Sequence, residues 1–117
     1  MSATPQQLMD GLADKNRQLT MKNDELQDLY KSHAEAEREY NIAYASKITS
    51  LRINGEPITI AKEIAKGDKP VADLFYKMRI AEGVLNACRE RIKDLRSSID
   101  TYRSILSWLK AEMETTK

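Results

Sequence analysis

The residues of this sequence that could do chemistry are few. The single cysteine, Cys88, falls between Leu85 and Ile92 at helical spacing. A catalytic thiol needs exposure to solvent and a neighbouring base that lowers its pKa, and this position in the middle of a helix offers neither. The single histidine, His33, has only Glu37 at a spacing that could share a metal ion, and a metal site needs more ligands. We therefore expect Cys88 to be buried and structural, and we predict no metal site and no cofactor.

Three acids alternate along the sequence at Glu35, Glu37 and Glu39. Alternate residues of a helix point roughly 200° apart, so these carboxylates do not converge as an acid–base pair would. The sequence has no glycine-rich phosphate loop and no Ser/His/Asp set. We predict that the protein is not an enzyme and has no catalytic residue.

Basic side chains form the sharpest chemical pattern. If Val71 is position a of a heptad repeat, position e holds Arg89, Arg96, Arg103 and Lys110, so one edge of a helix is positive. Guanidinium and ammonium groups bind phosphate oxygens. This edge is therefore a candidate site for a nucleotide or a nucleic-acid backbone.

Two more lysines join the basic edge if the chain folds back symmetrically about residue 61. The predicted anion-binding or nucleotide-binding cluster then comprises Lys15, Lys22, Arg96, Arg103 and Lys110. Two other interpretations remain open. The cations are ordinary flanking charges that pair across a coiled coil, or a partner subunit supplies acids such as Asp10, Asp14 or Asp24.

The composition excludes several classes of protein. The 117 residues include 19 Lys+Arg and 18 Asp+Glu, so the net charge of +1 argues against wholesale coating of nucleic acid. No apolar run approaches the ~18–20 residues of a membrane span, and we expect no membrane partner. One cysteine cannot form an internal disulfide, which favours a reducing compartment. We expect one helical domain, residues 1–117, in the cytoplasm.

Three segments build this domain. A helix is predicted over residues 5–51, with Thr4 as its N-cap, Pro5 at its first position and Gln7 completing a capping box. A connector over 52–69 holds the Asn54-Gly55 turn dipeptide and a short helix at 60–66, for which Thr59 is the expected cap. Four isoleucines of the connector are expected to be buried. They are Ile53, Ile58, Ile60 and Ile64.

The strongest signal predicts a long helix over residues 70–115, capped by Asp68. All thirteen heptad core positions from Val71 to Met113 are apolar, over about 65 Å of helix. Because the connector is short, the fold class is all-α: a long antiparallel helical hairpin of coiled-coil type with a short helical connector.

A two-helix hairpin leaves apolar surface exposed to water, which a second copy would cover. We predict a homodimer or higher oligomer, with a dimeric four-helix bundle as the leading assembly. The predicted interface consists of Phe75, Val84, Ile99, Ile105, Leu106 and Trp108.

The stretch from Ala34 to Ile99 carries an L-R-x-x-G-x-P-x-T turn, an A-K-G-D element and an A-C-R-E sequence in the long helix. It resembles uncharacterised small helical proteins of phages and prophages of Gram-positive bacteria, found in early or recombination gene clusters. The resemblance implies a phage protein acting in the host cytoplasm and transfers no functional residues.

Two functions follow as expectations. The first is a non-catalytic phage early protein that binds a host or phage protein as a helical interaction module, with counter-defence as one such role. The alternative is a protein that binds or sequesters nucleic acid or a signal nucleotide during phage recombination, replication or immune evasion.

Overall fold

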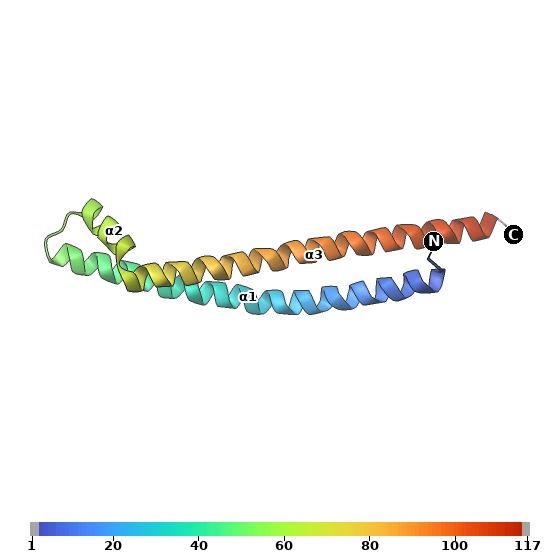
Figure 1. Ribbon diagram of the computed structural model, residues 1–117, viewed down its shortest axis with the longest axis horizontal. Coiled ribbons are helices and arrows are strands. Elements are labelled where there is room, and N and C mark those ends of the chain that lie inside the picture. The colour runs from blue at the N-terminus through green and yellow to red at the C-terminus, as the bar shows by residue number, and fades with distance from the viewer. Residues whose placement is uncertain (1–2, 116–117) are drawn as a thin grey trace. The chain divides into compact units, whose positions relative to one another are not determined.

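The computed structural model describes residues 3–115, which form three helices and no strand. Helix α1 spans Pro5–Ile53, α2 spans Ile58–Gly67 and α3 spans Lys69–Thr115. Figure 1 shows α2 joining the two long helices. The all-α class and the order of the three helices are confirmed, and each helix ends within two residues of its predicted bounds.

Local chemistry sets the beginning and end of α1. The Thr4 hydroxyl oxygen accepts a hydrogen bond from the Gln7 backbone N–H at 3.1 Å, and the Gln7 side chain accepts one from the Thr4 N–H at 2.9 Å. This is the predicted capping box. After α1, Gly55 takes a φ of 95°, a left-handed conformation that glycine adopts without strain. The predicted turn is therefore confirmed.

The start of α2 differs from the prediction. Pro57, with φ −59°, occupies the N-cap position, and no side chain caps the helix there. The backbone N–H of Ala61 donates to the Pro57 carbonyl oxygen at 2.9 Å, so the helix is already established two residues before Ile60. The predicted Thr59 cap is wrong. The fixed φ of proline suits a helix entry, and the first helical N–H groups need no side-chain partner where water reaches them.

The inward face of α2 also differs from the prediction. Ala61 and Ala65 are fully buried, whereas Ile58, Ile60 and Ile64 are 44%, 49% and 41% exposed. The expected burial of the connector isoleucines, Ile53 included, is wrong. Alanines four residues apart let α2 approach its neighbours closely, and the larger branched side chains are left on its outer side.

The packing divides into two compact units, each with its own short core. Unit 1 comprises Met1–Leu26 and Ala87–Lys117, and unit 2 comprises Gln27–Asn86. In unit 1 the buried apolar residues are Leu8, Cys88, Ile92, Leu95 and Ile99. In unit 2 they are Ala36, Ala61, Ala65, Val71 and Leu85. The single domain stays a prediction.

Unit 2 includes the end of α1, all of α2 and the start of α3. The Asp68 side chain accepts a hydrogen bond from the Val71 N–H at 3.4 Å, so it caps α3 as predicted. The other carboxylate oxygen of Asp68 lies 3.5 Å from the Lys47 ammonium. This pair places the start of α3 beside Lys47, six residues before the end of α1.

Candidate functional site

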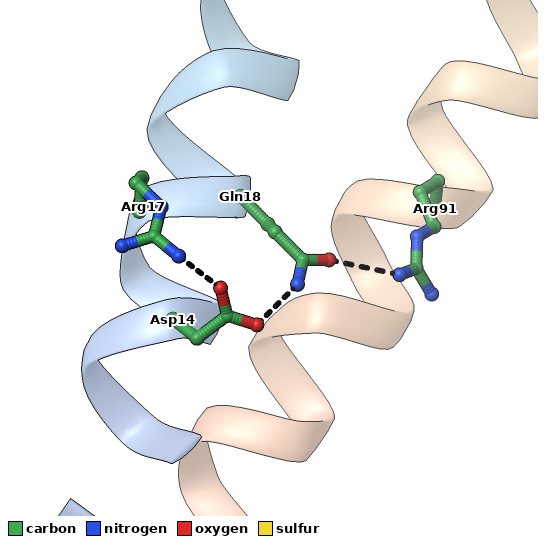
Figure 2. A network of polar contacts seen from close by, with 4 residues as sticks. All are labelled: Asp14, Arg17, Gln18 and Arg91. Atoms are coloured by element: carbon green, nitrogen blue, oxygen red, sulfur yellow. Dashed lines mark hydrogen bonds and ion pairs between the residues drawn. The ribbon is translucent and has the colours of Figure 1, made fainter. Parts of the chain in front are cut away.

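A polar network joins α1 to α3 in unit 1 (Figure 2). The Arg91 guanidinium donates to the Gln18 side-chain oxygen at 3.1 Å, and the Gln18 amide donates to Asp14 at 2.7 Å. Arg17 forms an ion pair with the other oxygen of Asp14. The network fixes which residues of the two helices face each other.

The register of unit 1 differs from the symmetric one. The Cys88 thiol donates to the Lys22 carbonyl oxygen, with 3.6 Å between sulfur and oxygen. A fold symmetric about residue 61 would instead place Cys88 opposite Ala34, twelve residues further along α1. The predicted register is wrong because α2 folds back, so α3 begins beside Lys47 rather than at the end of α1.

The new register separates Lys22 from Arg96. Lys22 donates to Glu25 at 2.9 Å, and this hydrogen bond, with the charge of Glu25, raises the pKa of Lys22 above its ordinary value. The positive charge of Arg91 acts on Lys22 in the opposite direction and lowers its pKa, so Lys22 lies near Arg91. Since Arg91 and Arg96 are five residues apart, they point about 140° apart around α3. Lys22 therefore lies by a different side of α3 from Arg96.

Distance along the helices separates the cations further. Lys110 borders a hollow that also contains Pro5, and Pro5 is seventeen residues from Lys22, or about 25 Å along α1. Lys15 is half-buried and lies two turns before Lys22. Lys22 and Lys110 therefore do not share one site, whereas Lys15 lies on the part of α1, between Gly11 and Gln18, that faces Tyr102 and Arg91.

Three of the five cations remain a coherent set. Arg96, Arg103 and Lys110 are exposed at seven-residue intervals on one edge of α3. None of the three has a hydrogen bond or ion pair with any residue of the described part of the chain. We call this set the basic row.

The predicted interface residues divide into exposed and buried groups. Phe75, Val84, Ile105 and Trp108 are 44%, 47%, 40% and 64% exposed, as a contact surface requires. Leu106 is half-buried. Ile99 is 4% exposed and belongs to the core of unit 1, so it is not available to a partner.

An aromatic cluster borders a hollow in unit 2. The Tyr40 ring lies 5.3 Å from that of Phe75 and 5.7 Å from that of Tyr44, measured between centroids. Tyr40 and Phe75, with Lys66, Val71 and Ala72, line a hollow of about 240 Å³. Such a hollow has room for one apolar side chain of a partner.

The exposed isoleucines of α2 form a surface that the sequence pattern did not predict. Ile60 and Ile64 are four residues apart and share one flank of α2, beside the buried Ala61 and Ala65. Ile53, just before the turn, is 80% exposed. The alanine pair was the available signal, because small residues at this spacing mark the side of a helix that makes the closest contact.

The other residues with chemical potential have simple surroundings. Cys88 is buried, as predicted. The His33 Nδ1 atom lies 4.0 Å from a Glu37 carboxylate oxygen. Within residues 3–115, no group of three or more His, Cys, Asp or Glu side chains could hold a metal ion. None of the helices over these residues is long and apolar enough to cross a membrane.

Comparison with known proteins found no matching family model, no matching curated protein and no matching solved structure.

Proposed function

We propose that the protein is a non-catalytic helical interaction module of a phage, which binds a host or phage protein. The observation that carries this proposal is the inverted packing of α2, which buries two alanines and exposes three isoleucines. Isoleucine on a surface loses the roughly 25 cal/mol per Å² that burial of apolar area provides. A partner protein that covers these side chains recovers that free energy.

The buried state of Cys88 and the single carboxylate beside His33 support a non-catalytic role. The exposed aromatic side chains Phe75, Tyr76 and Trp108 support a binding role, because aromatic residues often anchor protein–protein contacts. The phage setting and a counter-defence role rest on the sequence motifs from Ala34 to Ile99.

The double variant Ile60→Asp, Ile64→Asp should lose the partner and keep the fold. The two side chains are 49% and 41% exposed, so carboxylates at these positions keep access to water in the free protein, but they cannot be buried against an apolar partner. The measurement is affinity capture from host extract with mass spectrometry, alongside circular dichroism of the free variant. A protein captured by the wild type should be depleted at least tenfold.

The matched control is Asn54→Asp, Thr59→Asp. It adds the same charge at exposed positions near the isoleucines and changes no large apolar side chain. The control should capture the partner as the wild type does. Equal capture by all three proteins, with unchanged helicity, would show that the isoleucine surface is not the contact.

A second candidate function is supported by the unpaired basic row of Arg96, Arg103 and Lys110. Under that function, the row binds phosphate groups of a nucleotide or nucleic acid. It requires that an oligonucleotide or cyclic nucleotide raises the melting temperature at low salt, and that Arg96→Gln, Arg103→Gln removes the rise.

A further inference from the structure

Two triplets of exposed charges on the long helices have opposite signs. On α3, in unit 1, Arg96, Asp100 and Arg103 give the order plus, minus, plus. On α1, in unit 2, Asp28, Lys31 and Glu35 give the order minus, plus, minus. The outer charges of each triplet are seven residues apart, or about 10.5 Å along the helix, so they are equally far apart in the two triplets.

The six side chains have no partner among the residues that the structure describes. Within each triplet the central charge lies three or four residues from an opposite charge, yet the structure forms no ion pair between them. Elsewhere in the chain such pairs do form, as between Lys69 and Asp73 at 2.9 Å. The triplets are therefore free to bind a complementary surface.

The structure forms no hydrogen bond or ion pair between the two triplets of one chain within the residues that it describes. A second copy of the chain can supply the complement that each triplet lacks.

We propose that the Arg96–Asp100–Arg103 triplet of one copy of this chain binds the Asp28–Lys31–Glu35 triplet of a second copy. From Arg96 forwards, the first triplet has spacings of four and then three residues. From Glu35 backwards, the second triplet has the same spacings. In an antiparallel pairing, each charge therefore lies opposite a charge of the other sign. Read in the same direction, the outer pairs match and Asp100 falls within one residue of Lys31.

The alternating signs favour this partner over nucleic acid. Asp100 lies between the two arginines and repels a continuous phosphate backbone. A partner helix that carries a lysine between two acids instead attracts Asp100 as well as the arginines. Heptad-spaced acids on a helix also repeat at the same interval as the arginines.

The apolar surface provides further area for a contact between copies. Among residues 3–115, ten apolar residues are buried, three of them alanines, whereas fifteen large apolar residues are exposed. A core this small leaves enough apolar surface uncovered to contribute to a second interface.

Sedimentation equilibrium at low and high salt tests the proposal. The wild type should associate at tens of micromolar, and association should weaken as salt screens the charges. Arg96→Glu, Arg103→Glu should raise the dissociation constant at least tenfold, and so should Asp28→Lys, Glu35→Lys. An equimolar mixture of the two variants should associate at least as tightly as the wild type, because one triplet is then wholly negative and the other wholly positive.

The control variant Lys62→Glu, Lys93→Glu makes the same change in net charge as Arg96→Glu, Arg103→Glu, at exposed, unpaired positions outside the triplets, and should associate normally. Single swaps report the direction of pairing: Arg96→Glu is rescued by Glu35→Arg if the helices run antiparallel and by Asp28→Arg if they run parallel. A wild type that sediments as a single chain, or a mixture that fails to associate, overturns the proposal. So does a monomeric wild type whose Arg96 and Arg103 bind an oligonucleotide.

The triplets share no residue with the isoleucine surface of the proposed protein-binding function. The isoleucine variant tests the binding of another protein and leaves both triplets intact, so either proposal can fail alone.

Discussion

Replacing Leu95 with alanine should lower the free energy of unfolding by about 2–5 kcal/mol, the usual cost of removing a buried leucine side chain. Leu95 is 1% exposed and is the largest fully buried side chain among the described residues. The loss should be near the upper end, because two helices have few neighbouring side chains that can move in to fill the cavity. Urea unfolding followed by circular dichroism, with linear extrapolation to water, measures it.

The matched control is Ile105→Ala, ten residues further along α3. Ile105 is 40% exposed, so its truncation should cost about 1 kcal/mol or less. Equal losses at the two positions would contradict the assignment of Leu95 to the core of unit 1 and of Ile105 to its surface.

The heptad pattern of α3 made the buried positions of this helix predictable in both units. Leu85, Cys88, Ile92, Leu95 and Ile99 recur at alternating spacings of three and four, and all five are buried. The same pattern contradicts the assignment of Ile99 to an interface between subunits. A residue at a heptad core position faces its own hairpin first, so only residues off that stripe remain for a partner.

The start of α1 and the turn after it were predictable because their causes are local. A threonine and a glutamine three residues apart form a capping box wherever a helix follows, and the left-handed φ of Gly55 needs only glycine. Thr59 is a residue type that often caps helices, but α2 begins before it, with Pro57 at the N-cap position.

The inward face of α2 and the register of the hairpin were not predictable from the pattern. Alanine and isoleucine both count as apolar, so periodicity alone does not choose between Ala61 and Ile60 as the buried side. That choice depends on how closely α2 approaches its neighbours. The register in turn depends on how far α2 folds back, which the Lys47–Asp68 pair reveals and the number of connector residues does not.

The cations illustrate how one error of register affects a site. Lys15 and Lys22 share a chemistry and a heptad spacing with the basic row, and a symmetric fold would have placed them beside it. In the structure Lys22 instead lies by Cys88 and pairs with Glu25. Side-chain type and spacing predicted the basic row on α3, but only the three-dimensional contacts could decide its neighbours on α1.

Gly11→Ala should destabilise the protein by about 1 kcal/mol, although alanine is the better helix former. An alanine Cβ at this position would lie 2.7 Å from the Tyr102 hydroxyl oxygen and 2.8 Å from its Cε1 atom, too close for a stable contact. Overpacking of this kind costs about 1–3 kcal/mol, whereas replacing glycine inside a helix gains about 1 kcal/mol. Urea unfolding measures the balance.

The comparison that isolates the Tyr102 contact uses two further backgrounds. In Tyr102→Leu the obstructing ring is gone, so Gly11→Ala should become stabilising by about 0.5–1 kcal/mol. Gly83→Ala, in α3, should stabilise the wild type by the same amount, since no atom lies within 4 Å of the position where its Cβ would be. The Gly11–Tyr102 cycle should then give an interaction energy of about 1.5–2 kcal/mol. If Gly11→Ala stabilises the wild type as much as Gly83→Ala does, Tyr102 does not pack on Gly11. The register of α1 against α3 in unit 1 would then be wrong.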